Sequence, residues 1–338
     1  MCRSTSLLFL LISLSWSQFG FAEFISNADS TKKLTGSRQL PEKADRYDSL
    51  CSKAEYTADA DSVIKYSDEA ISLALSLRLN PSRALILKGN GFHMSGKLTQ
   101  AVECFTLAAK LYEEENNPVG IATAYAYLSA TYISQQNHNN AKLYLKRAIE
   151  IFGNENDSAR LASAMHNLGF EYYRVQQYDS ALVLFAATSE VYQKLNLDSE
   201  NAYCIGNTGL VYSKMNDLKK AEENLVNAIT ILEKHSDAYA VADFTNEYAF
   251  VLQRKGKITN ALHHAYKSYG IASMNNITEL KRDAAFRLAQ IYEQIQRYDS
   301  ALHYQLMYFT YSDSIRNLES IQKTADLRTE FEVAQKQV

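Results

Sequence analysis

The chain has 338 residues, a formal net charge of −3 and a hydrophobic content of 46%. This content is enough for a sizeable core, and the length suits either two domains or one elongated array. Acidic and basic residues are interleaved along the chain, unlike the concentrated positive charge with which nucleic-acid-binding proteins neutralise phosphates. We therefore expect no nucleic-acid partner.

Residues 1–22 have the pattern of a signal peptide. Arg3 supplies a positive charge, an apolar run covers residues 7–15, and small residues near Ala22 suit a cleavage site. The run is short for a membrane span, although an uncleaved anchor is the alternative. No later segment approaches the ~20 apolar residues of a transmembrane helix. We expect an exported protein, periplasmic or extracellular, with no membrane span in the mature chain; continuation of the native chain beyond Val338 would allow a membrane tether.

Residues 23–40 are mostly polar and have no helical period, which predicts a flexible linker. Pro41 then suits the first turn of a helix, and helical periodicity continues almost to the end of the chain. After signal cleavage the chain keeps three widely spaced cysteines: Cys51, Cys104 and Cys204. We interpret them as small buried hydrophobic residues, and a reactive or intermolecular thiol is the alternative.

A forty-residue repeat dominates the chain after the linker. It is marked by Ala101, Ala141, Ala181, Ala221, Ala261 and Ala301. Nine residues before each alanine is a large side chain, at Phe92, Tyr132, Tyr172, Tyr212, Leu252 and Tyr292. Twelve residues before it is a small one, at Gly89, Ser129, Gly169, Gly209, Ala249 and Ala289. Small residues permit close helix contacts and large ones fill the remaining gaps, so the pattern predicts stacked helical hairpins.

These residues resemble the tetratricopeptide repeat, whose pattern is met by Leu168-Gly169, Tyr172, Ala181 and Phe185. The resemblance covers residues 41–312. The family's tryptophan is absent and the period is forty instead of thirty-four, which we interpret as helices about one turn longer. The resemblance implies an all-α, right-handed superhelical solenoid of about seven hairpins with a concave binding face.

Residues 313–338 lack Gly and Pro and have the apolar spacing of a long amphipathic C-terminal helix. One interpretation is a cap on the last repeat. The other is that residues 321–332 resemble the segment that leads from the repeats into a membrane span in exported bacterial tetratricopeptide sensors. The sequence leaves both open.

No catalytic or metal-binding motif is recognisable in the sequence. The segment Gly89-Asn90-Gly91 begins like a dinucleotide loop, but it lies within a repeat helix. His263 and His264 are adjacent, so on a helix their side chains diverge by about 100° and do not easily share a metal. We expect a protein that is not an enzyme and that has no cofactor.

The resemblance also implies a peptide-binding surface on the first helix of each repeat. In this family an asparagine just before the Leu-Gly pair often holds the backbone of a bound peptide, and Asn167 and Asn207 occupy that position. Tyr127 and Glu247 are the equivalent residues on either side. The alternative is that these asparagines bond to a neighbouring helix.

Seven residues further along the same helices is a basic series: Arg174, Lys214 and Arg254. Stacked repeats would align them into a stripe for acidic side chains or a terminal carboxylate. The alternative is that these charges pair with nearby Glu and Asp. Further candidate contacts, which are alternatively core residues, are His166, Phe170, Tyr173 and Phe250.

The leading hypothesis is therefore that the chain is a module that binds a protein or peptide, with an acidic ligand. We expect this module to be the extracytoplasmic sensory part of a bacterial signalling protein. The alternative is a free-standing periplasmic or surface scaffold that assembles other proteins.

Overall fold

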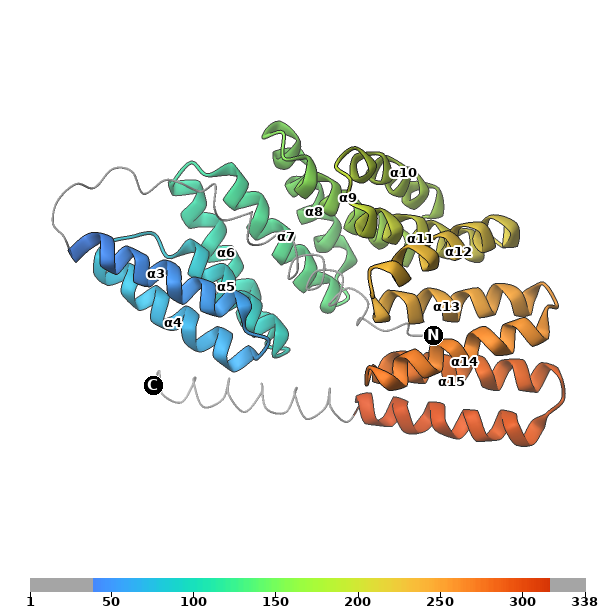
Figure 1. Ribbon diagram of the computed structural model, residues 1–338. Helices are drawn as coiled ribbons and strands as arrows, with labels where there is room; N and C mark the ends of the chain where they lie inside the picture. Colours follow the sequence, from blue (N-terminus) through green and yellow to red (C-terminus); the bar gives the residue numbers. More distant parts are fainter. Residues whose placement is uncertain (1–38, 317–338) are drawn as a thin grey trace. The chain divides into compact units, whose positions relative to one another are not determined.

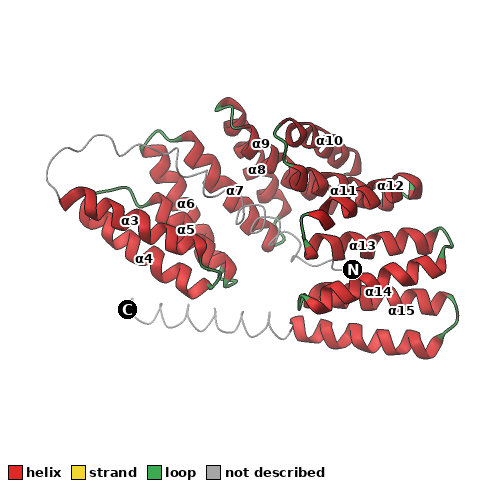
Figure 2. Cartoon of the chain, viewed as in Figure 1, coloured by secondary structure: helices red, strands yellow, loops and turns green. Residues whose placement is uncertain are grey.

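The computed structural model describes residues 39–316, and every regular element in that range is a helix (Figure 2). The helices are α3 (Gln39–Tyr56), α4 (Ala60–Leu77), α5 (Ser82–Met94), α6 (Leu98–Glu114), α7 (Pro118–Ser134), α8 (His138–Asn154), α9 (Ser158–Arg174), α10 (Tyr178–Lys194), α11 (Asp198–Lys214), α12 (Leu218–Lys234), α13 (Ala238–Arg254), α14 (Ile258–Met274), α15 (Thr278–Gln294) and a final helix at residues 298–316 (Figure 1). The predicted signal peptide, nearly all of the linker, and residues 317–338 lie outside the described residues.

Successive helices pair into seven hairpins within residues 39–316. We call the first helix of each hairpin the A helix (α3, α5, α7, α9, α11, α13, α15) and the second the B helix (α4, α6, α8, α10, α12, α14 and residues 298–316). The all-α solenoid of about seven hairpins is thus confirmed, and its right-handed superhelix stays a prediction.

The chain divides into two compact units, residues 1–164 and 165–338, with the division inside α9. In the first unit each helix from α3 to α8 packs on the next, around a core that includes Leu85, Phe105 and Leu128. In the second unit the same holds from α10 to α15. Here the A helices α11, α13 and α15 also contact one another in succession, which brings equivalent positions of adjacent repeats together.

The helices from α7 to α15 are each 17 residues long and are joined by three-residue turns. A residue with positive φ stands every twenty positions from Gly96 to Gln296. In the α7–α8 turn the amide of Gln136 bonds to the carbonyl of Ile133 (2.9 Å) and that of Asn137 to Tyr132 (2.8 Å). The Asn137 side chain then accepts from the amide of Asn140, so three residues end one helix and begin the next.

The small residues of the repeat lie where helices approach closely, as predicted. Ala181 is fully buried. A methyl group at Gly209 would lie 2.8 Å from Cγ of Leu225 on α12. Gly206 on α11, which the repeat pattern did not single out, faces Phe244 on α13, and a methyl group there would lie 2.8 Å from Cδ2 of that ring and still closer to Cε2 and Cζ. Glycine at this position therefore sets the spacing between two A helices.

The final helix begins at residue 298 and continues without interruption past residue 313, where we expected a separate helix to begin. Residue 313 thus does not mark a helix boundary, although most of the predicted C-terminal helix lies outside the described residues. None of the described helices combines the length and the apolar character needed to cross a membrane.

The three cysteines are unpaired thiols. Cys51 and Cys204 are buried, and Cys104 is half-buried. Burial raises the pKa of the Cys51 and Cys104 thiols to about 11, and it also raises the pKa of Cys204. Protonated thiols in these positions act as small hydrophobic residues.

Candidate ligand-binding site

The candidate site is built from equivalent positions on the A helices of the second unit. The forty-residue register places Asn207, Glu247 and Arg287 at the same position of α11, α13 and α15, which contact one another in turn. On α13 the side chains of Glu247, Phe250 and Arg254 share one helix face, because they are three and seven residues apart.

Three cations surround the ring of Phe250. The guanidinium carbon of Arg287 lies 4.5 Å from the ring centroid, that of Arg254 lies 5.7 Å away, and Nζ of Lys214 also lies 5.7 Å away. All three distances are within the ~6 Å range of cation–π attraction. We call Lys214, Glu247, Phe250, Arg254 and Arg287 the cationic cluster.

Glu247 is the carboxylate of the cationic cluster and is only 4% exposed. Ser213 Oγ donates to its Oε1 (2.7 Å), Lys214 Nζ lies 3.9 Å from the same oxygen, and Arg287 Nη2 lies 4.0 Å from Oε2. One carboxylate among three cations leaves the cluster with a net positive charge. The buried carboxylate therefore helps to hold Lys214 and Arg287 beside the ring.

Two of the cations are accessible to a ligand. Arg254 is exposed, and its Nη2 donates to Asn216 Oδ1 (3.0 Å), while the Lys214 side chain is 29% exposed. Phe250 between them is half-buried. A planar guanidinium held against a ring keeps N–H groups at its edge for a carboxylate or phosphate, so this arrangement suits an anionic group beside an apolar one.

Asn207 and His166 form a buried pair between α11 and α9. Asn207 Nδ2 donates to His166 Nε2 (2.8 Å), and the two residues are 1% and 6% exposed. Burial lowers the pKa of His166 to about 4, so the ring is neutral at pH 7 and Nε2 is an acceptor. Asn207 thus bonds to a neighbouring helix, the alternative that the sequence left open. Asn167 is half-buried on α9, and its role in peptide binding stays a prediction.

The first member of the predicted basic stripe lies in a different environment from the other two. Arg174 Nη1 lies 3.5 Å from Oε1 of Glu171, a fully buried carboxylate on the same helix. The Tyr173 ring packs 5.7 Å from Phe170 and 6.2 Å from Tyr178. The structure therefore brings Lys214 and Arg254 together around Phe250 and gives Arg174 its own ion pair.

The sequence reasoning missed Arg287, although the signal was present. Arg287 stands forty residues after Glu247, at the position occupied by Asn167 and Asn207 in earlier repeats. Extending that register by one repeat identifies the residue. The contact between Arg287 and the Phe250 ring depends on how α13 and α15 pack, which the repeat register does not predict.

A sequence model of the family described as soluble NSF attachment protein (SNAP) matches residues 84–224. No curated protein matches the chain by sequence.

Several solved structures are similar to the chain. Aspartyl phosphate phosphatase F from Bacillus subtilis is 13% identical, with a TM-score of 0.62 over 91% of this chain and 83% of that one. A Rap protein complexed with Competence and Sporulation Factor is 14% identical, with a TM-score of 0.61 over 94% and 89%. The apo form of the quorum sensor NprR from B. thuringiensis is 11% identical, with a TM-score of 0.58 over 91% and 97%. The described residues therefore have a tetratricopeptide-like fold, as the sequence resemblance predicted.

Proposed function

We propose that the chain is a protein- or peptide-binding module that uses the cationic cluster to hold an acidic group of its partner. The observation that carries the proposal is the arrangement of Lys214, Arg254 and Arg287 around Phe250, with Arg254 exposed. Charge-assisted hydrogen bonds to the guanidinium groups would hold the acidic group, and the ring would contact an adjacent apolar one.

The similar structures support a binding role through their names. One is a complex with Competence and Sporulation Factor and another is a quorum sensor. A third carries the name of a phosphatase, which describes that protein. We propose that this chain binds its partner without catalysing a reaction.

A random peptide library with free C-termini tests the proposal, because it presents acidic side chains and terminal carboxylates without naming a ligand. Peptides captured by the protein at low ionic strength should be enriched in Asp and Glu. Lys214→Gln and Arg254→Gln should each weaken capture about tenfold, the value expected for one charge-assisted hydrogen bond.

Lys219→Gln is the matched control, since it removes one exposed charge from the B helix α12. It should leave capture unchanged. If the Lys214→Gln and Arg254→Gln variants captured the same peptides with wild-type affinity, the cationic cluster would not be the site.

We further propose that this module is the extracytoplasmic sensory part of a signalling protein, with a free-standing scaffold as the alternative. The signal-like N-terminus and the resemblance of residues 321–332 to a sensor segment support this proposal. The intact mass of the native protein in soluble and membrane fractions distinguishes the two. A soluble species of residues 23–338 favours the scaffold, a heavier membrane species favours the sensor, and a cytoplasmic chain that keeps residues 1–22 contradicts export.

A further inference from the structure

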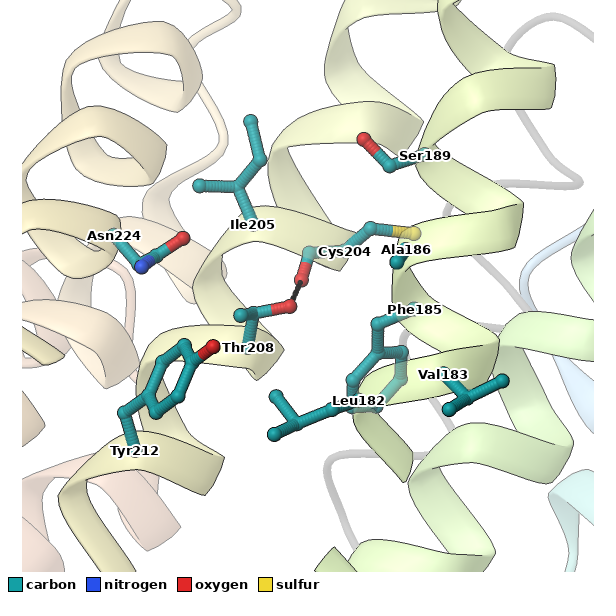
Figure 3. Close-up of a pocket in the computed structure, with 10 residues that line it drawn as sticks. All are labelled: Leu182, Val183, Phe185, Ala186, Ser189, Cys204, Ile205, Thr208, Tyr212 and Asn224. Atoms are coloured by element: carbon teal, nitrogen blue, oxygen red, sulfur yellow. Dashed lines mark hydrogen bonds between the residues drawn. The ribbon is translucent and has the colours of Figure 1, made fainter. Parts of the chain in front are cut away.

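A cavity of about 400 Å³ lies between α10, α11 and α12 (Figure 3). Its walls include Leu182 and Ala186 from α10, Ile205 and Thr208 from α11, and Asn224 from α12. Thr208 lies one residue after Asn207, so it projects from α11 about 100° away from that residue. The cavity is therefore on another side of α11 from the position that Asn207 shares with Glu247 and Arg287 in the next repeats.

Rings of the protein itself occupy the equivalent positions in the next hairpin. Forty residues after Thr208 and Asn224 are Tyr248 and His264. The ring centroids of Tyr248 and His264 lie 4.7 Å apart, and Tyr248 packs on the core cluster of α13, α14 and α15. Two large rings thus stand where the cavity has a threonine and an asparagine.

In two other hairpins only the position of Asn224 has a ring, since Leu128 and Leu288 stand at the position of Thr208. Eighty residues after Asn224 is Tyr304, which stacks on Tyr292 with ring centroids 5.8 Å apart. Eighty residues before Asn224, in the first unit, is Tyr144, whose ring lies 5.4 Å from Tyr125 and 5.6 Å from Tyr132. Tyr304 also lies 5.9 Å, centroid to centroid, from Tyr266 on α14, the residue eighty positions after Ala186, so the groove between these two B helices holds aromatic side chains.

We infer that the cavity is a binding site for one aromatic side chain that a partner polypeptide inserts between α10 and α12. Other hairpins place rings at these positions, whereas Ala186, Thr208 and Asn224 stand here and line the cavity. The volume of about 400 Å³ is within the roughly 300–1,000 Å³ of small-molecule pockets, and so is ample for a ring.

The polar groups of the cavity define which aromatic side chain fits. Thr208 Oγ1 already donates to the carbonyl of Cys204 (2.8 Å), and Asn224 Nδ2 already donates to the carbonyl of Lys220 (2.8 Å). Thr208 Oγ1 and Asn224 Oδ1 can still accept a hydrogen bond, and the hydroxyl of Tyr212, which also lines the cavity, can donate or accept one. The site therefore favours a ring that carries a donor, the O–H of tyrosine or the N–H of tryptophan, over phenylalanine.

Methyl NMR on protein labelled at Ile, Leu and Val tests the inference, because Leu182, Val183 and Ile205 line the cavity. Titration with N-acetyl-tyrosinamide should shift these three residues and leave Val251 on α13 unchanged. N-acetyl-phenylalaninamide should bind about threefold to tenfold more weakly, the effect of one neutral hydrogen bond. No shift of Ile205 or Leu182 with either tyrosine or tryptophan amide would overturn the site. Binding of p-cresol without binding of the amides would overturn the polypeptide partner.

Two double variants exchange the side chains of the cavity with those at the equivalent positions of the next hairpin, and they provide the decisive test. Thr208→Tyr with Asn224→His should fill the cavity and abolish the shifts, with the melting temperature unchanged or raised. The reciprocal change, Tyr248→Thr with His264→Asn, should open the next groove, so that the probe also shifts Val226, the residue forty positions after Ala186. Wild-type shifts in the first variant, or no new shift in the second, would refute the inference.

The cavity is independent of the proposed function, since it does not include the cationic cluster. Arg254→Gln should leave binding of N-acetyl-tyrosinamide unchanged while it weakens capture of acidic peptides. Failure of the cavity and failure of the cationic cluster are therefore distinguishable in the same protein.

Discussion

The contact between Gly206 and Phe244 sets the distance between α11 and α13, and a double-mutant cycle measures it. Gly206→Ala should improve the helix propensity of α11 by about 1 kcal/mol. The new methyl group would also lie 2.8 Å from Cδ2 of Phe244 and closer to two other ring atoms. Overpacking of this kind costs about 1–3 kcal/mol, so the net change should be a loss of stability of up to about 2 kcal/mol.

The sign of the effect should reverse when the ring is removed. In a Phe244→Leu background the clash is relieved, and Gly206→Ala should stabilise the protein by about 1 kcal/mol through helix propensity. The coupling energy between the two positions should therefore be about 1–3 kcal/mol. Urea denaturation followed by circular dichroism, with comparison of midpoints at constant slope, measures all four variants.

Gly270→Ala is the matched control, because Gly270 lies within α14 and a methyl group there would have no atom of a neighbouring helix or distant residue within 4 Å. It should stabilise the protein by about 1 kcal/mol in both the wild-type and the Phe244→Leu backgrounds. If Gly206→Ala had the same effect in both backgrounds, α11 and α13 would not be held together through this contact.

Three further predictions follow from burial and charge. Ala181→Arg should cost at least about 3 kcal/mol and lower the melting temperature, because Ala181 is fully buried and a long cation does not fit there; wild-type stability would refute the repeat register. Burial lowers the pKa of His93 and His166 to about 4. The free energy of unfolding should therefore fall as pH falls from 6.5 towards 4, by up to about 3 kcal/mol for each histidine. Urea melts of the His166→Gln variant should show a weaker dependence on pH. Capture of acidic peptides should weaken as salt rises from low to physiological strength, and a salt-independent affinity would contradict a charge-based site.

The hairpins were predictable because their determinants are local and periodic. Alanines, glycines and large residues recur at fixed spacing along the chain. The same register identified Lys214 and Arg254, since residues seven apart on stacked helices line one face.

The individual contacts of the site were not predictable, because they depend on side-chain directions between helices. Arg174 and Lys214 are equivalent in sequence, but a buried carboxylate at Glu171 pairs with the first on its own helix. Asn207 is equivalent to Asn167, yet a histidine on α9 is its partner. The first outcome depends on a residue of the same helix, and the second depends on a residue of the preceding repeat.

A residue with positive φ stands at every twentieth position from Gly96 to Gln296, so one helix and its turn together span twenty residues. The array can therefore gain or lose a whole hairpin of forty residues without a change in the turns. Removal of residues 198–237 would join α10 to α13 through a turn of the same geometry, because Leu197 and Asp237 occupy equivalent places. The helices would keep their phase, whereas loss of one residue would rotate all later helices by about 100°. New neighbours would then meet across the A helices, with Glu247 placed beside the repeat that carries Asn167. The deletion would thus change which side chains lie next to one another on the A helices.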